Sequence, residues 1–208
     1  MRHLPKLKNK EFAVFKRLNS PAKVQNFLNQ TPINFEYAGE TLRSPLMVLR
    51  RQKAHCLEGA MLAAAIFWFH GQTPLLLDLE TTQADQSHVV ALFKRDGYWG
   101  AVSKTNHAVL RFRDPIYKTI RELALSYFSE YFLDNGKKTL RRYSRPFSLL
   151  RFGTDWLTTE KNLWPIDQAL DKIQHLPIIS QRMAKELRLA DPIEIAAGKL
   201  VEWKKKKA

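Results

Sequence analysis

The sequence contains a single cysteine and no apolar stretch long enough to span a membrane. One cysteine excludes an intramolecular disulfide, which fits a reducing compartment. The longest stretch without a polar side chain, residues 59–69, falls well short of the roughly 18 residues that a membrane helix needs. The basic N-terminus is not followed by an apolar run, so a secretory signal is not expected. We therefore expect a soluble, cytoplasmic protein that does not enter a membrane.

Acidic residues are also few, with 20 Asp and Glu against 34 Lys and Arg, which gives a net charge of +14. The basic residues are dispersed, and their densest run, Lys204–Lys207, is most simply a solvated tail. The charge leaves open weak, non-specific binding to nucleic acid or to an acidic protein. No glycine-rich phosphate loop appears, and no cysteine or histidine pair has the spacing of a zinc site. We therefore expect neither a cofactor nor a metal.

The most informative segment begins at Cys56. Residues 59–69 are apolar on every face of a helix, which predicts a helix buried in the core of a domain. His70 and Gly71 would end that helix as a glycine cap does. Cys56 then lies in the first turn, where unpaired backbone N–H groups and the helix dipole favour a thiolate.

A histidine and a serine are predicted to lie together on the strands that follow. Three strands are expected, over residues 74–79, 88–93 and 99–103. Asp96-Gly97 is a strong signal for a two-residue hairpin, which places His88 opposite Thr105 and diagonal to Ser103. Because side chains alternate along strands, His88 and Ser103 share a face. A cysteine, a histidine and a polar residue are the parts of a nucleophile–base–orienter site.

This order and spacing resemble the transglutaminase-like superfamily, which is related to the papain-like cysteine peptidases. The resemblance is carried by Ala54–Ala60, His88–Phe93 and Tyr98–Ser103, and it covers residues 53 to about 106. It implies a catalytic cysteine that opens a buried helix, a histidine that begins a strand, and an aspartate that ends the next strand. Ser103 holds the position of that aspartate, so it can accept the imidazole N–H but adds no negative charge.

Several roles at such a site have more than one candidate. Asn34 and Gln52, upstream of the cysteine, are candidates to bind an oxyanion together with the Cys56 backbone N–H. Trp99 is a candidate substrate platform, although core packing is its simpler interpretation. The alternatives to Ser103 as orienter are Thr105, Asn106 and Asp114.

Each candidate also has a purely structural interpretation. A lone cysteine is more often a small buried hydrophobe than a nucleophile. His88 alone would be an ordinary strand residue with a satisfied hydrogen bond. His55, His88 and His107 near Cys56 suggest a metal, but their spacing does not support one.

We predict an α+β fold, in which the cysteine-bearing helix packs on a small antiparallel sheet with flanking helices at both ends. Residues 1–52 would form an N-terminal helical segment, 53–150 the transglutaminase-like core, and 151–208 a C-terminal helical appendage with a basic tail. Further along, a strand is expected over 107–113, a turn at Asp114-Pro115 and an amphipathic helix over 119–132.

The leading functional hypothesis is a cysteine-dependent enzyme that transfers acyl groups or hydrolyses amides, acting on a peptide, amide or acyl substrate. The alternative is a non-catalytic binding module on the same fold that engages nucleic acid or an acidic partner through its basic surface.

Overall fold

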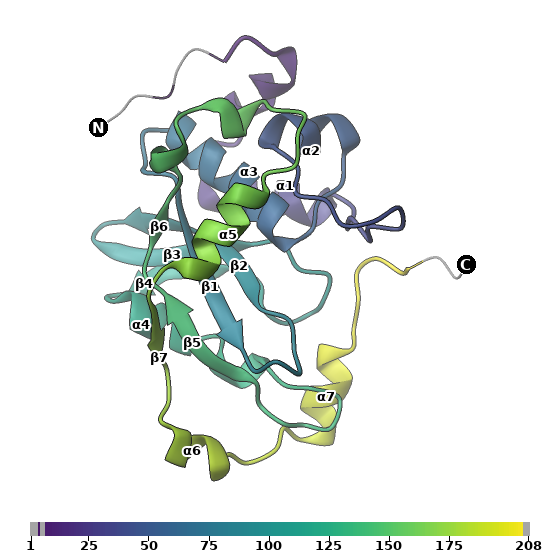
Figure 1. Cartoon of the computed structure of the whole chain (residues 1–208), viewed down its shortest axis with the longest axis vertical. Helices are drawn as coiled ribbons and strands as arrows, with labels where there is room; N and C mark the ends of the chain where they lie inside the picture. Colours follow the sequence, from purple (N-terminus) through teal and green to yellow (C-terminus); the bar gives the residue numbers. More distant parts are fainter. Residues whose placement is uncertain (1–3, 5–6, 206–208) are drawn as a thin grey trace.

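The computed structural model describes Leu4 and residues 7–205 (Figure 1). Four helical elements are followed by four consecutive strands and then by a mixed C-terminal part, and the η elements are 3-10 helices. Their bounds, in chain order, are η1 (Lys10–Lys16), α1 (Pro21–Gln30), α2 (Pro45–Arg51), α3 (Cys56–Phe69), β1 (Leu75–Thr81), β2 (His88–Arg95), β3 (Tyr98–Ser103), β4 (Arg113–Tyr117), α4 (Ile120–Leu125), η2 (Phe128–Glu130), β5 (Leu140–Ser144), β6 (Phe147–Ser148), η3 (Leu149–Phe152), η4 (Asp155–Leu157), α5 (Trp164–Lys172), β7 (His175–Pro177), α6 (Gln181–Lys185) and α7 (Pro192–Gly198).

The strands form one seven-stranded antiparallel sheet in the order β4-β3-β2-β1-β5-β7, with β6 also paired to β1. Asp96 and Gly97, both at positive φ (51° and 88°), form the tight turn between β2 and β3. The register places Ser103 opposite Val90. The predicted hairpin and its register are therefore confirmed, and so is the α+β architecture with the cysteine helix packed on the sheet.

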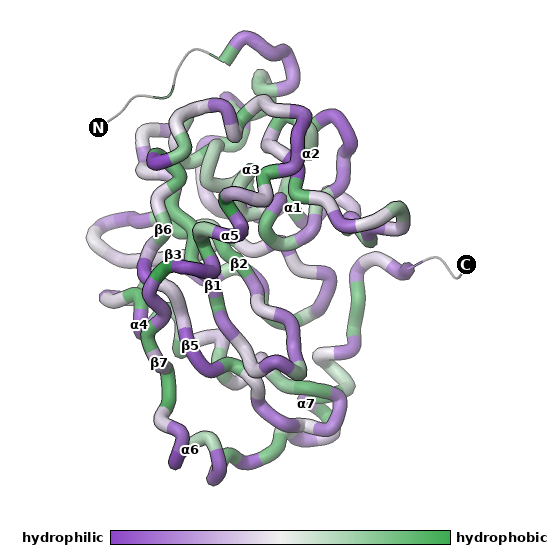
Figure 2. Tube along the Cα trace, viewed as in Figure 1, coloured by the Kyte–Doolittle hydropathy of each residue, from purple (hydrophilic) through white to green (hydrophobic). Residues whose placement is uncertain are grey.

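Both faces of the sheet are buried. On one face, Val89, Ala91 and Phe93 of β2 belong to the same hydrophobic cluster as α3. On the other face, Val90 and Leu92 pack with apolar residues of α4 and the segment after it. Burial on both faces explains why β1 and β2 are nearly continuous apolar runs instead of alternating patterns. Figure 2 shows that the trace becomes hydrophilic toward the loop joining these two strands.

Helix α3 lies at the centre of the helical layer (Figure 1). Every residue from Leu57 to Trp68 is buried, as predicted for a helix with no polar face. Helices α1, α2 and α5 surround it, and Trp156 stacks on Trp68. Residues from both predicted flanking segments thus belong to the cluster that contains α3. Of the described helices, none has the length and hydrophobicity needed to cross a bilayer.

The predicted strand over 107–113 and the turn at Asp114-Pro115 are both wrong. Residues 107–112 form a loop, in which Leu110 has a positive φ of 60°, and Asp114-Pro115 lies inside β4. Strand β4 is at the edge of the sheet, where a proline without an N–H group is tolerated. Pro115, which suggested a turn in the sequence, therefore lies in an edge strand.

The predicted helix over 119–132 is also too long, because α4 ends at Leu125. The Ser126 hydroxyl donates to the Leu123 carbonyl at 2.6 Å, and Arg113 donates to the Ser126 carbonyl at 3.1 Å. These bonds engage two carbonyls that a continuing helix would use. The chain then makes the short η2 and turns back toward the sheet.

Gly59, one turn after Cys56, allows α3 to lie directly against β3. A Cβ atom at this position would overlap the Cβ of Lys104, which follows β3. We expect Gly59→Ala to lower the free energy of unfolding by about 1–3 kcal/mol through overpacking. Helix propensity alone predicts the opposite sign, a gain of about 1 kcal/mol. Urea unfolding measures whether overpacking or helix propensity has the larger effect. A stabilised variant would show that α3 and β3 are not in tight contact.

Candidate active site

Cys56 is the first residue of α3 and lies partly exposed at the wall of a cleft. The cleft has a volume of about 420 Å³. Its walls come from segments far apart in the sequence, namely residues 33–36, 55–56, 85–88, 104–110, 130–134 and 195–199. Helix α3 therefore presents its N-terminal turn to a space that a substrate could enter.

His88 and Ser103 are brought together as the hairpin register predicts. The His88 Nε2 and Ser103 Oγ atoms are 2.7 Å apart, and the Ser103 hydroxyl donates to the Leu110 carbonyl at 2.6 Å. Since the hydroxyl proton is used, Ser103 accepts the Nε2–H of His88. This fixes the ring and leaves its other nitrogen, Nδ1, for the thiol of Cys56, which is hydrogen-bonded to His88.

A second imidazole, His55, also contacts the thiol. Its Nε2 lies 2.8 Å from the Thr41 carbonyl and 3.7 Å from Oε1 of Glu58. The histidine spacing in the sequence suggests only a metal-ligand role for His55. A more useful signal is the glutamate three residues after the N-cap position, the second half of a capping box.

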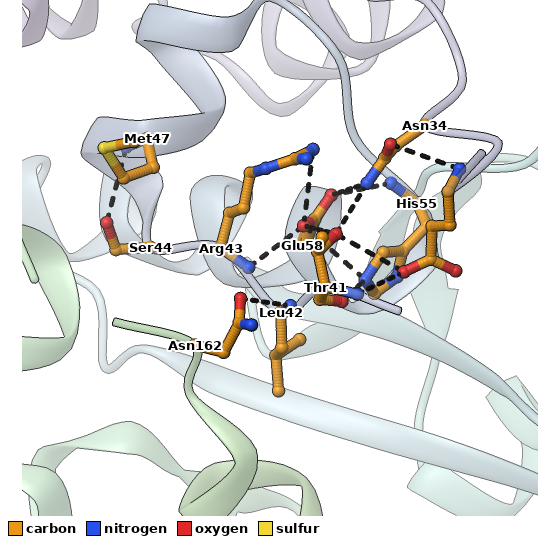
Figure 3. Close-up of polar contacts among 10 residues, drawn as sticks. Asn34, Thr41, Leu42, Arg43, Ser44, Met47, His55, Glu58 and Asn162 are labelled. Carbon is orange, nitrogen blue, oxygen red and sulfur yellow. Dashed lines mark hydrogen bonds and ion pairs between the residues drawn. The ribbon is translucent and has the colours of Figure 1, made fainter. Parts of the chain in front are cut away.

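The carboxylate of Glu58 is completely buried and fully hydrogen-bonded (Figure 3). It accepts from the backbone N–H groups of Arg43 (2.9 Å) and His55 (3.1 Å). It also accepts from the Thr41 hydroxyl (3.0 Å) and the Asn34 amide (3.2 Å). The loop before α2 is thereby joined to the first turn of α3, next to the thiol.

These contacts change the proton affinities of the thiol and of His55. Burial by itself would raise the pKa of the Cys56 thiol, but hydrogen bonds from His55 and His88 and their positive charge lower the pKa to about 5. Burial by itself would lower the pKa of His55, but the bond to Cys56, the charges of Cys56 and Glu58, and the Thr41 carbonyl raise it to about 9. At neutral pH the site therefore holds a thiolate and an imidazolium.

The structure does not gather all the predicted oxyanion and substrate-binding residues. Asn34 lines the cleft, but its amide donates to both Thr41 and Glu58. Gln52 ends α2 and borders a different cavity. Trp99 packs under Lys94 with the cluster on the other face of the sheet, outside the cleft lining.

Two of the alternative orienters are engaged or placed elsewhere. Asn106 exchanges two hydrogen bonds with the backbone of Trp203, and Asp114 is in the edge strand β4. Thr105 and His107 lie in the cleft wall. Within the described part of the chain, no group of three or more His, Cys, Asp or Glu residues is arranged to hold a metal ion.

Comparison with known protein families and with curated proteins finds no match to this chain. The resemblance to the transglutaminase-like superfamily therefore depends on the residues quoted above and on the arrangement of Cys56, His88 and Ser103.

The first prediction at this site concerns the thiolate. Iodoacetamide should alkylate native Cys56 with a single step near pH 5 and a plateau through neutral pH, because the thiolate forms above its pKa of about 5. In urea the step should move to about pH 8.5, the ordinary value for cysteine.

His55→Gln removes one positive charge and should move the native step upward. His70→Gln, at the opposite end of α3, is the control. Unchanged profiles in His55→Gln would show that this imidazole does not act on the thiol.

The second prediction concerns the hydroxyl that orients His88. Ser103→Ala leaves the Leu110 carbonyl and the His88 Nε2–H without their partner, which should cost about 1–3 kcal/mol of unfolding free energy. The alkylation step should also move upward, because His88 is no longer held against the thiol. Ser144→Ala is the matched control, since Ser144 is a buried serine on β5 that binds the backbone of Asp78 away from the cleft. A loss of stability without any change in alkylation would contradict the orienting role.

Proposed function

We propose that this chain is a cysteine-dependent enzyme of transglutaminase-like type that transfers acyl groups or hydrolyses amides. The observation that supports this most strongly is the placement of Cys56 at the start of a buried helix, in contact with two imidazoles, in the wall of an open cleft. A thiol with a lowered pKa at a helix start beside histidine is the microenvironment of reactive cysteines. A core cysteine would instead be enclosed by apolar side chains.

The reaction would begin with attack of the Cys56 thiolate on a substrate carbonyl carbon. A sulfur–carbon bond forms, and the carbonyl π electrons move to the oxygen. The proton given up by the Cys56 thiol would be held by His88. Collapse of the intermediate breaks the carbon–nitrogen bond, the leaving amine takes that proton from His88, and a thioester remains on Cys56. Water or a second amine then attacks the thioester, with His88 as the base. Amide hydrolysis and acyl transfer share the first half of this sequence.

The two histidines would divide the work. His55 is placed against the buried carboxylate of Glu58, which keeps a positive charge beside the thiolate. His88 is bonded to the neutral hydroxyl of Ser103, so no carboxylate holds its proton. It can therefore exchange a proton with the leaving and attacking groups, while His55 keeps the sulfur ionised.

The third prediction tests the covalent step with p-nitrophenyl acetate as the acyl donor. The protein should release a burst of p-nitrophenolate equal to the enzyme concentration and carry one acetyl group on Cys56 by mass spectrometry. Cys56→Ala removes the only thiol of the chain and should abolish the burst. His88→Ala should slow the turnover that follows the burst by about 10²–10⁴, because His88 is the general base when water attacks the thioester.

A binding module on the same fold is the second candidate. It is favoured by the neutral Ser103 at the position of the family's aspartate and by the net charge of +14. The same experiment separates the two functions. Alkylation by iodoacetamide without acetylation by the ester would contradict the enzyme and favour the binding module.

A further inference from the structure

Tyr131 has a buried hydroxyl for which the described residues provide no hydrogen-bond partner. The side chain is 3% exposed and follows η2. The nearby Tyr127 is also buried, but its hydroxyl donates to the Arg111 carbonyl at 3.1 Å. Buried hydroxyls are nearly always paired, because an unpaired one costs folding free energy. An unpaired hydroxyl at this place therefore indicates a group that enters from outside the protein.

Tyr131 borders the same cleft as the thiol. Tyr131 lines the cavity together with Cys56, His88 and Asp85. Burial, followed by the negative charges of Cys56 and Asp85, raises the pKa of Tyr131 far above its ordinary value. The phenol therefore keeps its proton at every working pH and is available as a donor.

An oxygen acceptor is the group that this position lacks. The proposed reaction develops negative charge on the substrate carbonyl oxygen, and such oxyanions need donors in addition to the backbone N–H groups of a helix start. Asn34 uses both amide hydrogens on Thr41 and Glu58, and Gln52 lies at another cavity. Neither residue predicted from the sequence for this role has a free donor in the cleft.

We propose that the Tyr131 hydroxyl donates a hydrogen bond to the carbonyl oxygen of the acyl substrate and stabilises the oxyanion of the tetrahedral intermediate. The inference rests on the proposed function, because it assigns a residue to the thioester-forming step. Tyr131 is then a catalytic residue supplied by the segment after α4, which borders the cleft together with the helix start.

The test compares two reactions of the same thiol in Tyr131→Phe, which removes only the oxygen. Acetylation by p-nitrophenyl acetate passes through an oxyanion and should be slowed by about 10²–10³, the effect of losing one oxyanion donor. Alkylation by iodoacetamide displaces iodide from a CH₂ group without forming an oxyanion, so its rate should stay within about twofold of wild type. Tyr127→Phe is the matched control and should leave both rates unchanged.

Each outcome bears on a different hypothesis. Equal acetylation rates in wild type and Tyr131→Phe would overturn the role of Tyr131 while leaving the enzyme intact. Parallel slowing of both reactions would overturn it too, because the hydroxyl would then act on the thiolate instead of the substrate. A wild-type protein that is alkylated but never acetylated would overturn the proposed function and this inference with it.

Thermal stability provides an independent readout. Because Tyr131→Phe removes a buried hydroxyl that has no partner, the melting temperature should stay the same or rise. Tyr127→Phe breaks a hydrogen bond and leaves the Arg111 carbonyl without that donor, so its melting temperature should fall. A fall for Tyr131→Phe equal to that for Tyr127→Phe would show that the hydroxyl has a partner within the fold, and would overturn the proposal.

Discussion

Helix α3 has no polar face, and this constraint arranges the rest of the chain. Water has to be kept from every side of the helix, and each fully buried large apolar side chain contributes about 1.5–3 kcal/mol. The sheet covers one side, α1 and α2 cover others, and residues 156–170 complete the cover. The cover opens at the first turn, where Cys56 is partly exposed although Leu57 is buried. The cleft therefore lies at the N-terminal end of α3, where the apolar cover of the helix stops.

A buried carboxylate fixes the geometry at that opening. Glu58 has no exposed surface, and its oxygens are shared among donors from the 34–43 loop and from His55. Removing a partner from a buried charge typically costs about 3–5 kcal/mol, so this loop and the helix start are expected to fold as one unit. His55 is held in place by the same network. The electrostatics of Cys56 therefore depend on a loop that acts through Glu58 and His55.

Local signals in the sequence predicted the part of the site that local structure determines. The apolar run located α3 and placed Cys56 in its first turn, and Asp96-Gly97 fixed the register that joins His88 to Ser103. The remainder depends on how loops fold against one another. Tyr131 reaches the cleft because the predicted helix stops early, at Leu125, after which the chain turns back. At that stop Ser126 bonds back to Leu123 and also accepts from Arg113 of β4, a contact that no local pattern reveals.

The hydroxyl of Ser103 is compatible with catalysis because of what surrounds it. The residue is fully buried, and its Oγ must accept from His88 and donate to the Leu110 carbonyl at the same time. A carboxylate could do only the first and would face the carbonyl oxygen with no proton between them. The transglutaminase-like family places a negative charge beside its catalytic histidine. In this chain the carboxylate of Glu58 lies beside His55 instead of His88. In the proposed reaction, the pair of Glu58 and His55 would keep the sulfur ionised, and the neutral Ser103 would position His88 as the base.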